Sequence, residues 1–466
     1  MSERIKINIF FLGIPFYVIT ILLIYFLLPV KLIPDYWLLG QSGLVVYFFT
    51  GIILFYRSTI VFSTNKFIKT LVFVNIIIKL SALILTYLFL KEQYGVGIIT
   101  TSDYYFYYST GIKIGNNILN FFTLTKDFAL SDTGAFIYYG AIYFIFGNSI
   151  FFAGLVNLFF ATWSVVLLYK IIQLIDTDKV ARLSAVIMSL IPILNFYVGI
   201  HLKEIIFIWT ILFTTYQLII SFQTKNLKLL KFILISLLII YLFTFRTVIA
   251  IFFILSIVIY LFWSKNISLS LLSKIGLIFV VGMSMFVFFS VSSAGDETDK
   301  YYQASESDQT ILSYNVIKKR GKNSIASSFI GLPPQMIMTL TGPYPTFINT
   351  NLEKLSKITH YSQIADTFVK SFLSFFFILC FFDIRFVKKN IFFASFNILY
   401  IITLSIGGLS LLYRMFLPIL PFYIYFASVG ISKFKSKNYL IFTLYLIGII
   451  ILYVYFNYSK VLDYSL

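Results

Sequence analysis

Long apolar runs alternate with short polar segments along most of this 466-residue chain. Roughly 20 apolar residues cross a bilayer as a helix, and backbone groups within the hydrocarbon must be satisfied inside each segment. The pattern therefore predicts an all-α polytopic membrane protein with about 13 transmembrane helices. We place these helices at 9–30, 38–56, 68–90, 150–173, 181–200, 204–222, 228–244, 247–263, 271–291, 367–382, 391–412, 414–432 and 438–457. The shorter apolar stretch 134–148 is typical of an interfacial helix.

Two longer polar segments interrupt the apolar pattern. We expect residues 1–466 to form a single integral membrane domain, with 91–133 as the first long outer loop and 292–366 as a large outer loop. The sequence contains no Gly-rich phosphate-binding loop and no stretch that predicts a soluble nucleotide-binding fold. Any polar chemistry must therefore lie in these loops or at the ends of the helices.

The basic residues are distributed unevenly between the predicted loops. With the N-terminus placed in the cytoplasm, the short inner loops receive about half of the 36 Lys and Arg residues. Few of the 18 acids fall on that side: Glu3, Asp176, Asp178 and Asp383. Short cytoplasmic loops typically carry such a basic excess and face anionic lipid. The net charge of +18 is therefore a topology signal and does not indicate nucleic-acid binding.

Composition narrows the class and the location. The chain is 60% hydrophobic and 12% charged, which is too apolar for a soluble domain of this size. The N-terminal "MSERIK" precedes a long apolar run without a small-residue cleavage site, so we expect a retained anchor. Spans rich in Ile, Phe, Lys and Asn are typical of an AT-rich bacterial genome. We predict a multi-pass protein of the bacterial plasma (inner) membrane with a cytoplasmic N-terminus.

Asp103 stands in the tyrosine-rich "SDYYFYY" of the first outer loop. A carboxylate can act as a general base or as an orienting group. The neighbouring Tyr104 and Tyr107 suit either a membrane interface or a sugar-stacking surface. An aromatic belt with one solvated acid is the competing interpretation.

A tight outer turn, "HLKEIIFIW", places His201, Lys203 and Glu204 between two predicted spans. Ionisable groups at the ends of apolar spans cost free energy unless they have partners or a function. The turn is either a solvated corner or the lining of an outer cavity that presents a carboxylate and a cation.

Arg246 and Arg414 each lie at the edge of a predicted span with little polar sequence nearby. A guanidinium suits bidentate phosphate binding. Pro418 and Pro421 follow Arg414 and remove backbone hydrogen bonds from the top of that helix. The alternative is that both arginines extend toward the membrane surface without binding a ligand.

The large outer loop 292–366 contains an acidic "GDETD", a basic "KKRGK" and a "TGPYPTF" segment. The acidic run leaves a divalent cation open as a cofactor, although its spacing matches no strong metal motif and a solvated loop is the better explanation. The two histidines, His201 and His360, are too few and too far apart in sequence to predict a metal site. The single cysteine, Cys380, lies in an apolar run and is expected to be a buried thiol.

Four stretches, "SDYYFYY", "GAFIYYGAIYFIFGNSIFFAGLVNLFF", "ARLSAVIMSLIPILNFYVGIHLKEIIFIW" and "YRMFLPILPFYIYFASVGI", occur in this order. The order resembles the polytopic glycosyltransferases of the GT-C class and the O-antigen and capsule repeat-unit polymerases of bacteria. The resemblance covers residues 100–260 and 330–432. It implies a GT-C-like fold and a donor sugar or oligosaccharide carried on polyprenyl phosphate or diphosphate.

The resemblance also implies residue roles. Asp103 matches the proposed base of GT-C enzymes, Glu204 matches an acid that begins a later span, and Arg414 matches an arginine that precedes a proline-containing span. One departure is that Asp103 follows the third predicted span, whereas the first long outer loop of the family follows the first. In the polymerase alternative the "TGPYPTF" segment matches a Pro-aromatic-Pro element, and arginines hold the pyrophosphate.

We therefore expect a lipid-linked sugar transferase that acts on the extracytoplasmic face during surface polysaccharide assembly. The alternatives are a repeat-unit polymerase and a lipid-linked oligosaccharide flippase or other transporter. The expected partners are a polyprenyl-(di)phosphate-linked saccharide and membrane lipid, without nucleic acid; the oligomeric state stays open. The candidate residues are Asp103, Glu204 and His201 for catalysis; Arg246, Arg414, Arg320 and Lys203 for phosphate; and Tyr104, Tyr107 and Tyr344 for sugar.

Overall fold

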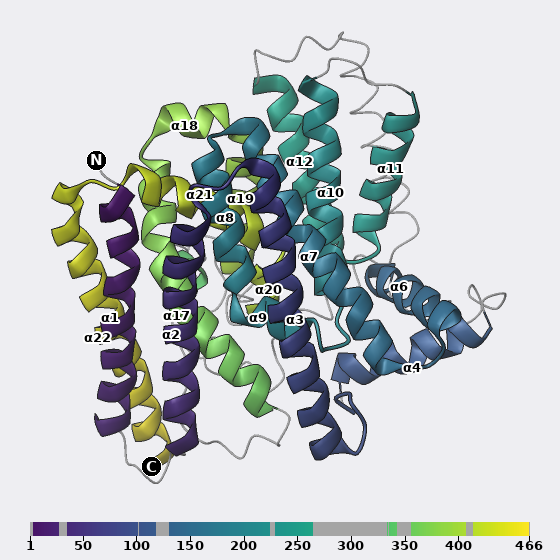
Figure 1. Cartoon of the computed structure of the whole chain (residues 1–466), viewed down its shortest axis with the longest axis horizontal. Coiled ribbons are helices and arrows are strands. Elements are labelled where there is room, and N and C mark those ends of the chain that lie inside the picture. Colours follow the sequence, from purple (N-terminus) through teal and green to yellow (C-terminus); the bar gives the residue numbers. More distant parts are fainter. Residues whose placement is uncertain are drawn as a thin grey trace, which may run out of the picture.

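The computed structural model (Figure 1) consists of helices and their connections, and the residues that it describes contain no strand. The prediction of an all-α chain is therefore confirmed. The structure describes residues 3–27, 35–100, 102–117, 130–223, 229–263, 333, 335–342, 356–406 and 413–465.

The described residues form α-helices over most of their length. The helices are α1 (Glu3–Leu27), α2 (Asp35–Thr59), α3 (Thr64–Tyr94), α4 (Ser102–Asn116), α6 (Leu130–Phe146), α7 (Ile150–Ile175), α8 (Asp178–Leu190), α9 (Pro192–Tyr197), α10 (Glu204–Gln223), α11 (Leu229–Phe243), α12 (Thr247–Trp263), α17 (Ser356–Phe381), α18 (Ile384–Lys389), α19 (Ile391–Ile406), α20 (Tyr413–Phe416), α21 (Leu420–Lys433) and α22 (Tyr439–Ser465).

Several of these helices are suited to cross a membrane. Among the described residues, six helices are long and apolar enough: Ile9–Phe26, Gly40–Thr59, Thr64–Tyr94, Ile150–Ile175, Glu204–Gln223 and Ser436–Tyr458. Shorter apolar helices cover Leu230–Phe243, Thr247–Trp263 and Ile391–Ser405. The chain is thus a helical membrane protein, while the number of 13 spans stays a prediction. The expected span 271–291 lies outside the described residues.

Two expected spans are interrupted. The stretch 181–200 forms α8 and α9, which are separated at Ile191 by an extended residue with φ −61° and ψ 118°. Proline cannot donate an amide hydrogen bond and its ring disfavours a helical residue before it, so Pro192 ends α8 and begins α9. The stretch 414–432 is likewise divided into α20 and α21. Both interruptions create helix ends inside the protein.

The segment 91–133, expected as a long loop, contains the helix α4, and the following α6 begins four residues before the expected 134. The two helices pack closely because glycines lie where they meet. A Cβ on Gly111 would come within 2.8 Å of the Cβ of Tyr139, and one on Gly140 within 2.6 Å of a methyl group of Ile114. Figure 1 shows α4 and α6 crossing obliquely at one side of the bundle.

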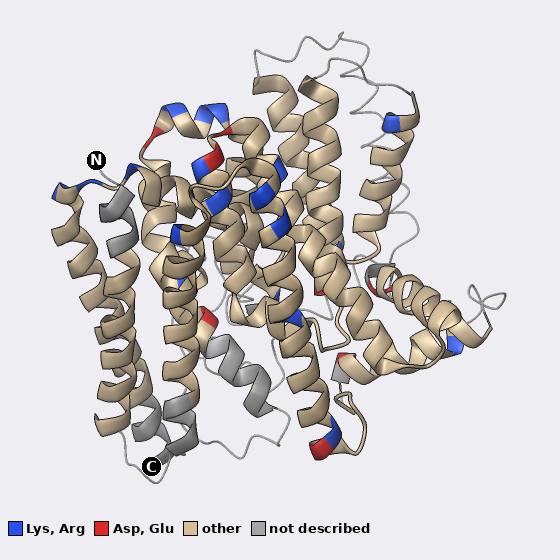
Figure 2. Cartoon of the chain, in the orientation of Figure 1, with Lys and Arg blue, Asp and Glu red and all other residues tan. Residues whose placement is uncertain are grey.

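Charged residues are distributed asymmetrically over the helix ends. Lys and Arg gather at the end of the bundle where α18 lies (Figure 2). The opposite side, with the start of α4, carries mixed charges. This asymmetry agrees with the basic excess in the predicted inner loops, and the cytoplasmic assignment of that end stays a prediction.

Candidate functional site

Six charged side chains from distant parts of the chain form three ion pairs within one region, which we call the charge cluster. Its members come from α4, α6, the start of α10, the turn before α12, and α20. The pairs are Asp103–Arg414, Asp132–Lys203 and Glu204–Arg246. The structure thus brings together Asp103, Lys203, Glu204, Arg246 and Arg414, which sequence analysis singled out separately.

All three acids of the charge cluster lie in the first turn of a helix. Asp103 is in the first turn of α4, Asp132 of α6 and Glu204 of α10. The unpaired amide groups at a helix N-terminus make a partial positive charge that favours an anion by about 0.3–1 kcal/mol. Each acid therefore lies where its helix favours a negative charge.

The Glu204–Arg246 pair is the most buried of the three. Its atoms lie 2.8 Å apart, with side chains only 2% (Glu204) and 10% (Arg246) exposed. The second carboxylate oxygen of Glu204 has no hydrogen-bond partner among the described residues. Such a pair repays its desolvation only while both charges remain, so each partner depends strongly on the other.

Asp132 and Lys203 form a second pair at 2.6 Å. The ammonium of Lys203 also donates to the carbonyl of Phe245 at 2.8 Å, and the hydroxyl of Tyr107 donates to Asp132 at 2.7 Å. Burial alone would raise the pKa of Asp132, but the charge and hydrogen bond of Lys203, with the Tyr107 hydroxyl, hold it below its usual range. Asp132 is therefore ionised at neutral pH.

The Asp103–Arg414 pair is the accessible one. Its atoms lie 2.5 Å apart, and the side chains are 42% and 34% exposed, respectively. Arg246 approaches the carbonyl of Arg414 at 3.5 Å, which links this pair to the buried one. The charges of Arg414, Glu204 and Asp103 all act on the hydroxyl of Tyr104, which indicates that this residue lies near both pairs. Asp103 and Arg414 are therefore the most exposed members of the charge cluster.

His201 is buried among tyrosines and does not join the ion pairs. Its ring stacks on Tyr139 at 5.2 Å between centroids and meets Tyr108 edge-on. Neither ring nitrogen has a hydrogen-bond partner among the described residues. Burial lowers the pKa of His201 to about 3. The imidazole is therefore neutral at physiological pH and a weak base, which argues against the predicted catalytic role.

The predicted sugar-binding tyrosines differ in access. Tyr107 is 4% exposed and its hydroxyl is engaged by Asp132, so a sugar ring cannot stack on it in this arrangement. Tyr104 is partly buried, and Tyr105 is 46% exposed. The remaining candidates, Arg320 and Tyr344, lie outside the described residues.

Asp132 is the only member of the charge cluster that was not among the site residues predicted from the sequence. A local signal exists, because "LSDTG" precedes an apolar run and Ser or Asp before such a run is typical of a helix start. Its partner, 71 positions away, is not visible in the sequence.

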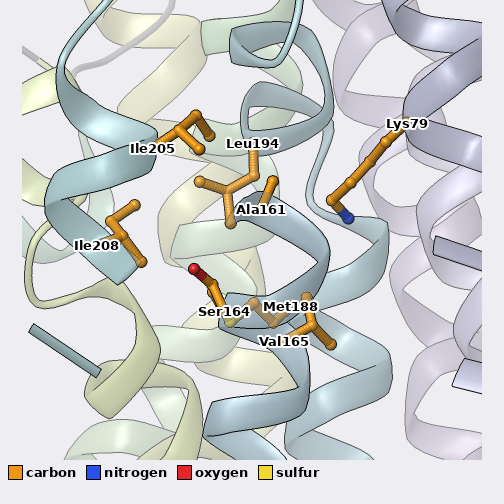
Figure 3. Close-up of a pocket in the computed structure, with 8 residues that line it drawn as sticks. All are labelled: Lys79, Ala161, Ser164, Val165, Met188, Leu194, Ile205 and Ile208. Atoms are coloured by element: carbon orange, nitrogen blue, oxygen red, sulfur yellow. The ribbon is translucent and has the colours of Figure 1, made fainter. Parts of the chain in front are cut away.

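A separate polar group lies in the middle of α3. The ammonium of Lys79 donates to the side-chain carbonyl of Asn75 at 2.5 Å, and Asn75 donates to Ser189 of α8 at 2.9 Å. Lys79 is 1% exposed. A small cavity beside it is lined mainly by apolar residues of α7 to α10, with Ser164 among them (Figure 3).

Metal-binding groups are not evident in the described part of the chain, where no three His, Cys, Asp or Glu residues gather as a metal site would require. The acidic "GDETD" segment lies outside the described residues. Cys380 is buried, as expected.

Comparison with known proteins finds no family model that matches this chain and no curated protein that matches its sequence.

Proposed function

We propose that this protein is a membrane-embedded glycosyltransferase that uses a polyprenyl-phosphate-linked sugar on the extracytoplasmic face, for surface polysaccharide assembly. One observation carries the proposal. Asp103, Glu204, Arg246 and Arg414 come from four distant segments and lie in one charge cluster. That cluster combines a partly exposed carboxylate with guanidinium groups, a combination that suits sugar transfer from a lipid phosphate.

The proposed reaction breaks the bond between the sugar C1 and the carrier phosphate oxygen. An acceptor hydroxyl attacks C1, its proton passes to the carboxylate of Asp103, and the electron pair of the broken bond leaves on the phosphate. Arg414 is the accessible cation that stabilises this developing charge. Arg246 and Glu204 hold the main chain of Arg414 in position, because the guanidinium of Arg246 contacts both Glu204 and the Arg414 carbonyl.

The donor is either a single sugar or a whole repeat unit. A repeat-unit polymerase on undecaprenyl diphosphate performs the same displacement with a larger leaving group. Its distinguishing residue in this chain, Arg320, lies outside the described residues, so the charge cluster supports both forms of the transferase.

A lipid-linked oligosaccharide flippase or other transporter is the second candidate. It is favoured by Lys79 in the middle of α3 and by the interrupted pair α8 and α9, because transporters often place polar groups and broken helices at the membrane midplane. The polar group around Lys79 is small, and the charge cluster has no role in this alternative.

Analysis of lipid-linked glycans and surface polysaccharide in a deletion strain, complemented with wild type, Asp103→Asn or Lys79→Met, separates these functions. A transferase predicts repeat units that lack one sugar in the deletion and Asp103→Asn strains, and normal glycans with Lys79→Met. Complete repeat units with only single-unit surface glycan would identify the polymerase. Complete units trapped on the inner face, with Lys79→Met defective and Asp103→Asn normal, would identify a transporter. Normal glycans in the deletion strain would reject all three.

A further inference from the structure

The charge cluster has no net charge. Three carboxylates and three cations are paired one to one, at 2.5–2.8 Å. Each cation that an incoming phosphate could bind is already paired with a carboxylate, so phosphate binding requires that one carboxylate separates from its cation. In a simple basic pocket, by contrast, the cations are not paired with carboxylates of the protein.

The exposed fractions identify which pair can open. In the Glu204–Arg246 pair both side chains are nearly inaccessible, and Lys203 is only 10% exposed and also bonds the carbonyl of Phe245. Separating either pair would leave a charge buried without compensation, which is strongly unfavourable. Arg414 and Asp103 are 34% and 42% exposed, so each can be solvated when the pair separates. A partly exposed pair of this kind is worth only about 0.2–1 kcal/mol.

We propose that Asp103 is a resident anion on Arg414 that the phosphate headgroup of the lipid donor displaces, and that this displacement releases Asp103 to accept the proton of the acceptor. The inference rests on the proposed function for the identity of the phosphate. Displacement couples donor binding to activation of the base, because Asp103 is held by Arg414 until phosphate takes the guanidinium. The leaving phosphate gains negative charge as its bond to the sugar breaks, so its hold on Arg414 strengthens while Asp103 becomes neutral.

The anion-exchange step can be measured without any sugar transfer. Purified protein in detergent is titrated with decyl phosphate, which carries the headgroup on a short lipid tail. Asp103→Asn removes the competing charge and should tighten binding by up to about fivefold, the equivalent of the energy of the pair. Asp103→Glu restores a carboxylate and should bind as wild type. Arg414→Ala should lose most of the binding.

Asp383→Asn provides the matched control. It removes the carboxylate from the Lys433–Asp383 pair, whose atoms lie 2.6 Å apart and whose side chains are 42% and 40% exposed. This variant should bind decyl phosphate as wild type, and both Asn variants should unfold within a few degrees of wild type. Equal tightening by both Asn variants would mean a general charge effect and would overturn the proposal. Unchanged or weaker binding by Asp103→Asn would also overturn it.

Inorganic phosphate separates the two sources of the headgroup. We expect it to bind at least tenfold more weakly than decyl phosphate, about the gain from a few buried methylene groups. Equal affinity would overturn the lipid origin of the phosphate. Failure of the proposed function is distinguishable, because normal glycans in the deletion strain would reject the transferase even if Asp103→Asn binds phosphate more tightly.

Discussion

Two sets of ion pairs in this molecule differ in how they are built. At the α18 end, Arg182 pairs with Asp178 four residues earlier in α8, and it also donates to the carbonyls of Thr59 and Phe62. This arrangement fastens the turn between α2 and α3 to α8. The charge cluster instead joins acids and bases separated by 42, 71 and 311 positions.

The ion pair of Arg182 has a structural role, whereas the charge cluster has features that a structural role does not explain. Arg182 directs its donors to Asp178 and to main-chain carbonyls at a turn, as a structural arginine would. The charge cluster places three carboxylates at helix starts and leaves one pair, Asp103–Arg414, open to solvent. The first region is explained by stability alone. The second contains the most exposed acid and base of the charge cluster beside the nearly inaccessible Glu204–Arg246 pair, which stability alone does not require.

The largest expected effect is at the buried pair. Arg246→Ala leaves the carboxylate of Glu204 buried without its cation, which should cost about 3–5 kcal/mol of stability. Thermal unfolding in detergent measures this loss. Adding Glu204→Gln removes the stranded charge and should recover a substantial part of it. A loss below about 1 kcal/mol for Arg246→Ala would show that the pair is as weak as an exposed one.

The next largest effect is the pH dependence at His201. Its pKa of about 3 lies below the ordinary value of 6.5, because burial disfavours the charged form. Above pH 6.5 the ring is neutral in both the folded and the unfolded protein, so His201 does not affect stability there. Between pH 6.5 and pH 3 only the unfolded protein binds a proton at His201. The free energy of unfolding therefore falls with pH in this window, by up to about 1.4 kcal/mol per pH unit. His201→Phe keeps an aromatic ring and should flatten unfolding curves recorded between pH 7 and pH 4. An unchanged slope would assign the acid sensitivity to other groups.

A smaller effect is expected at Tyr107. Tyr107→Phe removes the hydroxyl that donates to Asp132 but keeps the ring, so about 1–2 kcal/mol should be lost. Chemical or thermal unfolding detects a change of this size. The loss should shrink when Asp132→Asn is already present, because the hydroxyl then meets an uncharged partner. Full additivity of the two substitutions would indicate that the hydrogen bond contributes little.

The smallest effect is expected at the exposed pair near α18. Lys433→Ala should change stability by less than about 1 kcal/mol, because both charges of the Lys433–Asp383 pair are well solvated. Surface glycan should be unchanged in a strain that carries this variant. A glycan defect with normal protein levels would show that the Lys433–Asp383 pair is also needed for function, which would contradict the distinction between this exposed pair and the charge cluster.

The fold class was predictable because apolar length is a strong signal, and the class of helical membrane protein is confirmed. Interruptions were harder to predict, since the sequence stays apolar through 181–200 and only Pro192 marks the break between α8 and α9. The helix α4 was missed because its 15 residues are too short and too polar to register as a span.

Most members of the charge cluster could be predicted individually from the sequence, but their pairing could not. Arg246 and Arg414 stand out because charge is rare at the edge of an apolar run, and Asp103 stands out among tyrosines. Their pairing is a product of tertiary folding, since Asp103 and Arg414 lie 311 positions apart. Asp132 was missed for the same reason, because its importance depends on contacts with Tyr107 and Lys203.

A charge-swap experiment tests most directly whether the charge cluster is a functional site. Asp103→Arg combined with Arg414→Asp keeps an ion pair at the same place but reverses the direction of the charges. Asp383→Lys combined with Lys433→Asp does the same at the α18 end. We predict that the first swap yields folded protein at normal levels without glycan assembly, while the second assembles glycan normally. Restored glycan with the Asp103/Arg414 swap would show that this pair serves stability alone and would contradict the account.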